Sequence, residues 1–354
     1  MKINHAILHI FDFVSCVNVM AQEELDLKEN KNAKNYALRL ARKTLGNLDN
    51  MRGEFAPDSL FTPELHAYFK CERDFVDLSI QIAEFLAREL NHAEKATSTD
   101  LLVLDFEDDP DQTVREMTDE EAEAAFEAQG RRYFALILLE SKQAFMHEVG
   151  QGETGLTSNT VARHHAILPN PSQKIPSYAI IDAQTMDVWF CDKPRTIAGQ
   201  ERWLIPDGLL QCSMQASAKE TFEAVTRIVE EVAEEYGENV AVATAKAKAY
   251  AMENADETDE LSPEELGRAV FEDNETLQRR FEEHVQEEEL PERVTVEKKV
   301  VQRVAKNHKI RTDTGIEITF PAEYSQNPDF IEFTSMPDGR ISISLKNIAH
   351  IENR

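Results

Sequence analysis

Short apolar segments that follow one another along the chain constrain the fold of this protein most strongly. TDLLVLDF at 99–106 indicates a buried strand, and RRYFALILLESKQAFMHEV at 131–149 indicates one long bent strand or two successive strands. SYAIIDAQTMDVWFCDK at 177–193 indicates two further strands around a turn at Ala183–Thr185. Because these strands come in runs and do not alternate with helices, we expect antiparallel pairing rather than βαβ units.

Other segments of the first half carry the signatures of an opening strand and of helices. We expect a strand at about 3–14 and helices at about 31–48, roughly 63–92 and about 118–129, the last of them acidic. The second helix has Thr62 as its expected N-cap and Pro63 at its first position. Strands and helices together make the first half an α+β domain.

The second half of the chain is helical from 216 to about 292. Phe222, Val225, Val229 and Val232 share one stripe, and Gly237 is expected to end that helix. A further helical segment is expected to begin at LSPEEL, with Ser262 as N-cap, Pro263 at the first position and Glu265 at the capping-box position.

The chain ends in a predicted β module. Ile316, Ile318 and Phe320 alternate with polar residues, as do Ile341, Ile343 and Leu345, and MPDGR supplies a tight turn between the later strands. We therefore predict an α+β fold in two domains. Residues 1–215 form an N-terminal mixed antiparallel sheet with helices, and 216–354 form an acidic helical segment followed by a basic helix and a small C-terminal β meander.

Charge is sorted into blocks along a chain whose formal net charge is −28. Residues 220–292 hold 23 acidic and 6 basic side chains, a net of −17, whereas 293–311 hold seven basic residues and the single acid Glu297. Strong overall acidity disfavours nonspecific contact with nucleic acid, because phosphates repel a negative surface. Any contact with DNA would have to come from local basic patches.

The segment KKVVQRVAKNHKIR at 298–311 is the first such patch. At about 100° per residue, a helix over its first nine residues separates the cations Lys298, Lys299, Arg303 and Lys306 from Val300, Val301, Val304 and Ala305. We expect the valines to pack on the β meander and the cations, with Lys309 and Arg311, to face phosphates. The alternatives are a solvated charged face, an intramolecular partner for the Glu-rich segment, or a strand without separate faces.

A second basic block, KNAKNYALRLARK at 31–43, has five basic residues and no acid. Arg39, Arg42 and Lys43 fall within about 100° of one another on the predicted helix, opposite Leu40 and Ala41. They are candidate assistants in DNA binding, and the alternative is an ordinary amphipathic surface helix.

Motifs for chemistry are weak. GQGETG at 150–155 matches the dinucleotide fingerprint but lacks a good helix opening after it, and the adjacent His164 and His165 diverge on a strand. The acids Asp105, Glu107, Asp108, Asp109 and Asp111 could hold Mg²⁺ in a nuclease, but a solvated acidic loop is favoured. We expect no enzymatic activity, no metal and no cofactor.

The expected setting is a reduced cytoplasm. Four cysteines lie far apart and form no CxxC pair, which fits neither a zinc site nor a dense disulfide framework. No segment approaches the roughly 20 consecutive apolar residues that a membrane span needs.

Three segments resemble the bacterial nucleoid-associated protein family of the NdpA/YejK type. They are the opening INHAILHIFDF, the central HHAILPNPSQKIPSYAIIDAQTMDVWFCDK running on to LLQCSMQASAKETFEAV, and the C-terminal HKIRTDTGIEITFPAEYSQNPDFIEFTSMPDGRISISLKNIAHI. The resemblance implies a cytoplasmic protein that associates with the nucleoid and with double-stranded DNA, as a homodimer and without enzymatic chemistry. It transfers no site residues, so the DNA-binding candidates come from charge alone.

The expected function is therefore that of a noncatalytic nucleoid-associated protein that binds DNA weakly and with little sequence preference through its basic patches. The alternative is an acidic interaction module, or a DNA mimic, that docks on a DNA-processing enzyme and reaches the nucleoid indirectly. A metal-dependent nuclease that uses the acids at 105–111 is a third hypothesis.

Overall fold

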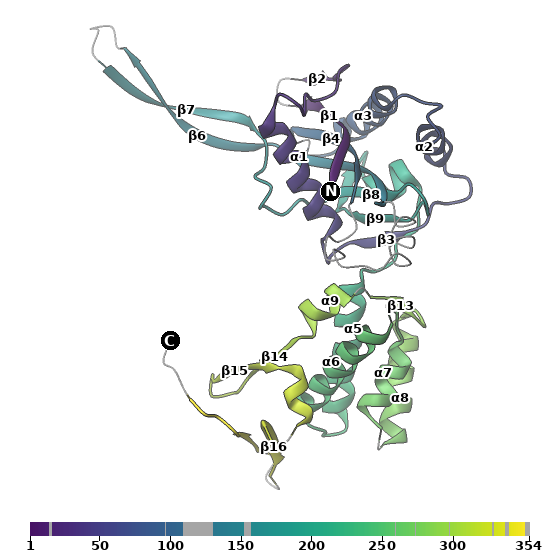
Figure 1. The fold of residues 1–354 in the computed structure, drawn as a ribbon, viewed down its shortest axis with the longest axis vertical. Coiled ribbons are helices and arrows are strands. Elements are labelled where there is room, and N and C mark those ends of the chain that lie inside the picture. The colour runs from purple at the N-terminus through teal and green to yellow at the C-terminus, as the bar shows by residue number, and fades with distance from the viewer. Residues whose placement is uncertain are drawn as a thin grey trace, which may run out of the picture. The chain divides into compact units, whose positions relative to one another are not determined.

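The protein divides into two compact units, Met1–Gln215 and Ala216–Arg354, drawn as a ribbon in Figure 1. The structure is a computed structural model, which describes residues 1–13, 16–95, 97–108, 130–151, 157–258, 260–272, 274–296, 298–327, 329–336 and 340–350. Among these residues, no helix combines the length and the apolar character that a membrane crossing needs. The acidic helix expected at 118–129 lies outside the described residues.

The first unit is built on a seven-stranded antiparallel sheet in the order β2-β1-β4-β5-β8-β9-β3. The strands are β1 (Lys2–Asp12), β2 (Val17–Val19), β3 (Met51–Gly53), β4 (Thr99–Glu107), β5 (Arg132–Glu140), β8 (Ser177–Asp182) and β9 (Val188–Cys191). The antiparallel pairing predicted from the runs of strands is confirmed, and so is the α+β class.

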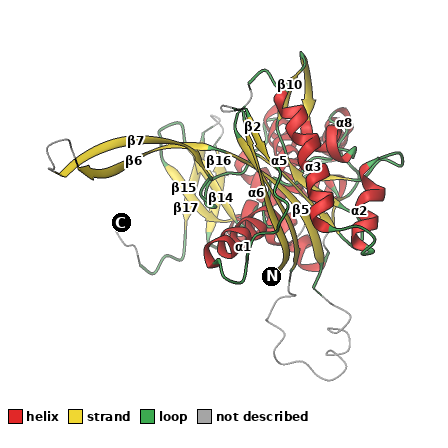
Figure 2. Cartoon of the chain, turned by 90° about the horizontal axis from the view of Figure 1, so that it is seen from above, coloured by secondary structure: helices red, strands yellow, loops and turns green. Residues whose placement is uncertain are grey.

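Helices cover both faces of this sheet, as Figure 2 shows. Helix α1 (Lys31–Leu45) packs on one face, where Leu40 and Ala41 join the alternate strand residues Leu102 and Leu104 in one core. Helices α2 (Phe61–Phe69) and α3 (Phe75–Asn91) cover the other face. Because the central strands β4, β5 and β8 are covered on both faces, they are apolar at successive positions and do not alternate.

The prediction of a single helix at 63–92 is wrong, because the helix is interrupted between α2 and α3. Cys71 has a positive φ of 59°, and the Asp74 side chain accepts hydrogen bonds from the backbone N–H groups of Val76 and Asp77, which caps a new helix. The expected cap at Thr62 is also wrong, because α2 starts one residue earlier, at Phe61.

The segment 131–149 forms two strands, the second of the two forms expected for it. Strand β5 ends at Glu140, and β6 (Lys142–Gln151) leaves the sheet and pairs with β7 (Thr157–Ile167). This two-stranded ribbon, which we call the arm, extends away from the sheet in both views (Figures 1 and 2). The chain then returns as β8, which pairs with β5, and the unit ends with β10 (Pro194–Ile197), β11 (Gln200–Trp203) and the π-helix η1 (Leu204–Leu210).

The helices of the second unit are α5 (Ala218–Glu235), α6 (Val240–Glu257), α7 (Pro263–Val270) and α8 (Glu275–Glu287), with the short strands β12 (Glu260–Leu261) and β13 (Val294–Thr295). The predicted stripe on α5 is confirmed, because Phe222, Val225, Val229 and Val232 are all buried. The predicted cap of α7 is also present, since the Ser262 side chain accepts a hydrogen bond from the Glu265 N–H. Helix α6 contacts α5, α7 and α9 and is rich in buried alanine.

The C-terminal strands form two hairpins rather than one continuous meander. After α9 (Lys298–Val304), strand β14 (Asn307–Arg311) pairs with β15 (Glu317–Pro321), and β16 (Ile331–Ser335) pairs with β17 (Ile341–Leu345). The 3-10 helix η2 (Ala322–Gln326) follows Pro321 and separates the hairpins. Three residues of the expected turn MPDGR, 337–339, lie outside the described residues.

Candidate nucleic-acid interface

Helix α9 has the two faces that the sequence predicts. Val300, Val301 and Ala305, which follows the helix, are buried, whereas Arg303 and Lys306 are exposed. The expected support for the valines is wrong, however, because α9 packs on α6 and α5 rather than on the hairpins. The alanines of α6 leave room for this close approach, since they add little volume between the helices.

Strand β14 extends the basic surface beyond the helix. Lys309 and Arg311 are two positions apart and exposed, so they share one face of the strand. His308 points to the opposite face, where it is buried with its ring centroid 5.4 Å from that of Phe320. We call Lys298, Lys299, Arg303, Lys306, Lys309 and Arg311 together the α9–β14 cluster.

Most described cations of this cluster are free to meet a ligand. Lys309 pairs with Glu317 at 2.8 Å. Among the described side chains, no acid pairs with Arg303, Lys306 or Arg311, and no ion pair joins these cations or Lys309 to an acid of 220–292.

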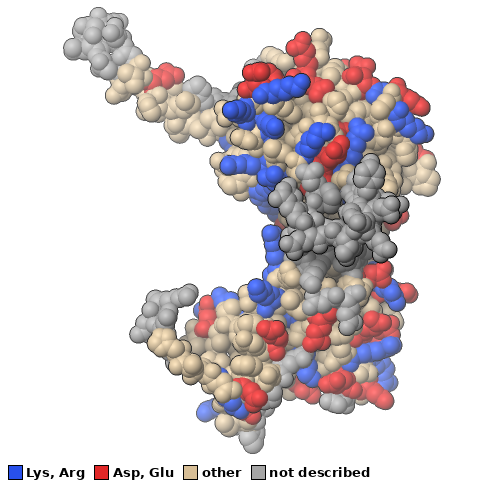
Figure 3. Space-filling view, in the orientation of Figure 1, with Lys and Arg blue, Asp and Glu red and all other residues tan. Residues whose placement is uncertain are grey.

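The acidic helices instead pair with their own few cations. Arg227 lies 3.1 Å from Glu231 and 2.7 Å from Glu288. Arg280 lies 3.2 Å from Glu235. Figure 3 shows red and blue side chains mixed over α7 and α8. Within the described part of the chain, local pairing therefore uses four of the six cations of 220–292, namely Arg227, Lys246, Arg268 and Arg280.

Lys248 is a cation near the cluster that sequence reasoning missed. It lies on α6, and its Nζ donates to the backbone oxygen of Asn307 in β14 at 3.4 Å. Burial lowers the pKa of Lys248, and burial together with this lysine lowers the pKa of His308 to about 4. No local signal in the sequence identifies Lys248, because it belongs to the acidic block and meets β14 only through the tertiary fold.

The second predicted patch lies on α1, in the first unit. Arg39 and Arg42 are exposed, opposite the buried Leu40 and Ala41, so the predicted amphipathic helix is confirmed. Lys43 is partly occupied: its Nζ donates to the backbone oxygens of Pro171, at 3.0 Å, and Gln173. Figure 3 shows Lys and Arg side chains gathered over α1. We call Arg39, Arg42 and Lys43 the α1 cluster.

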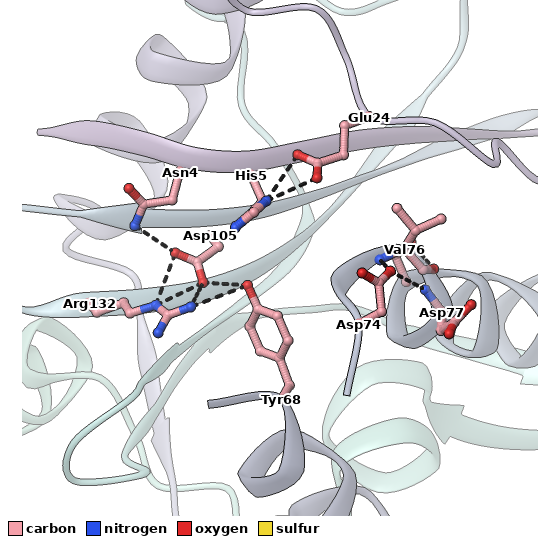
Figure 4. Close-up of polar contacts among 10 residues, drawn as sticks. Asn4, His5, Glu24, Tyr68, Asp74, Val76, Asp77, Asp105 and Arg132 are labelled. Atoms are coloured by element: carbon pink, nitrogen blue, oxygen red, sulfur yellow. Dashed lines mark hydrogen bonds and ion pairs between the residues drawn. The ribbon is translucent and has the colours of Figure 1, made fainter. Parts of the chain in front are cut away.

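Asp105, the first acid of the suggested nuclease site, is fully buried and already bonded (Figure 4). Arg132 donates to it through Nη2 at 2.7 Å and Nε at 2.9 Å, the Tyr68 hydroxyl donates at 2.6 Å, and Asn4 Nδ2 donates at 3.0 Å. The hydrogen bond to Asp105 raises the pKa of the Arg132 guanidinium, and burial followed by the Asp105 charge raises the pKa of Tyr68.

This arrangement joins β1, β4, β5 and α2 through one carboxylate, so Asp105 has a structural use that competes with metal binding. Asp109 and Asp111 of the suggested site lie outside the described residues. Within the described part of the chain, no group of three or more His, Cys, Asp or Glu side chains is arranged to hold a metal ion.

Of the glycine motif at 150–155, residues 152–155 lie outside the described residues. Gly150 and Gln151 close β6, and the next described residues form β7 rather than a helix. A pyrophosphate would need the N–H groups of a helix N-terminus at that point. His164 and His165 are successive residues of β7, at a point where the register between β6 and β7 shifts.

Comparison with known proteins gives one family. The family model described as nucleoid-associated protein YejK matches residues 7–352. No curated protein matches the chain.

Proposed function

The chain belongs to the nucleoid-associated protein YejK family, and we propose that it is a noncatalytic protein that binds double-stranded DNA weakly and with little sequence preference. The family gives it a role at the nucleoid. We further propose that it acts in the cytoplasm as a homodimer and that the α9–β14 cluster is its main contact with DNA.

The observation that carries this proposal is the pair of exposed cations Arg303 and Lys306, which have no acidic partner among the described residues. Lys309 and Arg311 are two further exposed cations, which follow on β14. In a chain with a net charge of −28, cations left unpaired beside an acidic segment are suited to an external anion. Side chains of this kind bind the phosphate backbone, which positions a protein and carries little sequence information.

Weak affinity follows from the charge of the rest of the molecule. Each cation that contacts a phosphate releases a counterion and so increases the affinity for DNA, whereas the net −17 of residues 220–292 repels the phosphates and lowers that affinity. Binding should therefore be sensitive to salt and tolerant of sequence. The α1 cluster is proposed to assist, chiefly through Arg39 and Arg42, because the ammonium group of Lys43 is already hydrogen bonded.

Charge reversal of the α9 cations tests the proposal. In the variant, Lys298, Lys299, Arg303 and Lys306 are all changed to Glu, and duplex DNA binding is measured at low salt by fluorescence anisotropy. We expect binding to be lost. The control has the same reversals at Arg227, Arg268, Arg279 and Arg280, which place an equal charge change on α5, α7 and α8. A cluster variant that binds as tightly as the parent overturns the assignment.

A second candidate is an acidic interaction module that docks on a DNA-processing enzyme. The 23 acids of 220–292 favour it, since several of them, including Glu234 and Glu238, are exposed on the second unit. In that case nucleoid association would be indirect. Pull-down before and after nuclease treatment separates the two functions: association that survives the loss of DNA favours the interaction module, and association that disappears favours direct binding.

A further inference from the structure

The arm is the least covered element of the first unit. Strands β6 and β7 pair from Lys142↔Ile167 to Gln151↔Thr157, and within the described residues neither strand pairs with any other. Two-stranded ribbons are marginally stable in water without a surface to cover them. Figure 2 shows the arm projecting away from the seven-stranded sheet.

One face of the arm carries three exposed apolar side chains, each paired across the strands with a polar residue, and we call it the apolar face. The cross-strand pairs Phe145↔Arg163, His147↔Val161 and Val149↔Asn159 lie on the same side of the ribbon. Phe145 and Val149 are each 68% exposed, and Val161 is 70% exposed. Scattered apolar residues are normal on a surface, but a contiguous row on a projecting ribbon indicates a docking surface.

The net charge of the arm indicates which class of partner its apolar face could bind. Residues 142–167 contain two basic and two acidic side chains, Lys142 and Arg163 with Glu148 and Glu153, so their formal net charge is zero. The guanidinium of Arg163 lies over the Phe145 ring, 4.9 Å from its centroid. Because a phosphate backbone is bound by an excess of cations, this neutral and apolar face fits a protein surface better than duplex DNA.

A matching surface occurs on the same unit. Ile10 of β1 and Val17 and Val19 of the edge strand β2 lie on one face of the sheet, since Ile10 pairs with Val19 and Asp12 with Val17. All three apolar side chains are exposed. We call them the β2 patch. An arm and a patch on one chain can be used twice across a two-fold axis, which is the commonest symmetry of homo-oligomers.

We propose that the apolar face of the arm docks on the β2 patch of a second copy of this chain, so that two arms are exchanged in a homodimer. A neutral arm suits this partner, because acidic surfaces of two chains that each carry −28 would repel. The inference deepens the homodimer in the proposed function and does not depend on its DNA-binding part, because the oligomeric state is measured without DNA.

Light scattering during size-exclusion chromatography tests this contact. The parent is expected at twice the chain mass of 40.3 kDa. An arm variant with Phe145, Val149 and Val161 changed to Ser, and a patch variant with Val17 and Val19 changed to Ser, are each expected at the mass of one chain. The control, Leu60→Ser with Met214→Ser, removes two other exposed apolar side chains of the unit and is expected to stay dimeric.

Mixing the two variants gives a sharper readout. The arm variant keeps an intact patch and the patch variant keeps an intact arm, so one of the two contacts can form between unlike chains. We expect the mixture to recover dimers that neither variant makes alone. A monomeric parent, a dimeric arm variant, or failure of the mixture to associate would each overturn the exchange. Loss of DNA binding by an arm variant whose mass is unchanged would also overturn it and assign the arm to DNA.

Discussion

His9 is a buried histidine whose neutral form is part of the first unit. Its Nδ1 accepts a hydrogen bond from the Ala21 N–H at 3.1 Å, so its Nε2 carries the proton and donates to Ser79 Oγ at 3.1 Å. The Ser79 hydroxyl in turn donates to the Val76 oxygen. Burial lowers the pKa of His9 to about 4.

This lowered pKa predicts a loss of stability in acid. The unfolded chain takes up a proton at His9 below its ordinary pKa of about 6.5, whereas the folded chain resists until about 4. The free energy of unfolding should therefore fall as the pH decreases between those values, by up to about 3 kcal/mol. Tryptophan fluorescence in denaturant measures it, since both tryptophans, Trp189 and Trp203, belong to the first unit.

The control for this prediction is His9→Gln, which has no imidazole to protonate. Asp100, whose pKa burial and Asp12 raise to about 6, is common to both proteins, so the difference between them isolates His9. If parent and variant lose stability equally between pH 6.5 and 4, His9 is not the titrating group.

Arg132 is expected to matter more for stability than the Tyr68 hydroxyl. Arg132→Leu leaves the fully buried Asp105 without its cation, which costs about 3–5 kcal/mol. Tyr68→Phe removes one hydrogen bond of several and costs about 1 kcal/mol. Denaturant unfolding compares the two. Equal costs would mean that the Asp105 charge is not held chiefly by Arg132.

At the scale of elements, Gly267 lets α7 and α8 approach each other. A Cβ at this position would lie 2.2 Å from Cδ1 of Phe281, whose side chain is fully buried. Gly→Ala within a helix normally stabilises by up to about 1 kcal/mol, but overpacking costs about 1–3 kcal/mol. We predict that Gly267→Ala lowers the melting temperature measured by circular dichroism. A higher melting temperature would show that Phe281 can move aside.

If the α9–β14 cluster contacts DNA as proposed, the carboxylate of Glu317 on β15 competes with phosphate for Lys309. Glu317 lies opposite Arg311 in register, and its carboxylate pairs with Lys309 at 2.8 Å. We predict that Glu317→Gln increases the affinity for duplex DNA, because it frees a cation and removes a repelling charge. Glu332→Gln, which breaks the equivalent pair with Lys346 on the next hairpin, is the matched control. Equal affinity gains in both variants would mean that only net charge matters.

Helices and caps whose pattern lies in adjacent residues could be predicted from the sequence. The segments against which they pack could not. The apolar stripe on α5 and the N-cap at Ser262 each depend on residues that are close together in the sequence. The break before Asp74 was hidden because apolar residues continue at helical spacing on both sides of it. The support of α9 by α6 joins segments about 50 residues apart, and only the fold brings them together.

The candidate site divides in the same way. Charge segregation found the α9–β14 cluster, and the helical wheel separated its faces correctly at Arg303 and Val301. Lys248 and the bonding of Lys43 were missed, because both depend on backbone oxygens that are distant in the sequence. The exposed face of the arm was missed because it depends on the register between β6 and β7.

At the scale of the whole molecule, the chain concentrates acidic residues in 220–292 and basic residues in 293–311. Acids of 220–292 pair with cations of their own helices, while Arg303, Lys306, Lys309 and Arg311 meet one acid, Glu317, among the described side chains. This separation is what allows an acidic protein to present a basic surface. It predicts that the salt dependence of DNA binding changes when cations of the α9–β14 cluster are removed and does not change when other cations are removed.

The salt dependence of duplex DNA binding tests this claim most directly. Each phosphate contact contributes about −0.9 to the slope of log K against log salt. Arg303→Gln with Lys306→Gln should therefore flatten the slope by roughly 2 units, whereas Arg227→Gln with Arg280→Gln, an equal loss of charge on paired cations, should leave it unchanged. Identical slopes in the parent and both variants would contradict binding through the α9–β14 cluster.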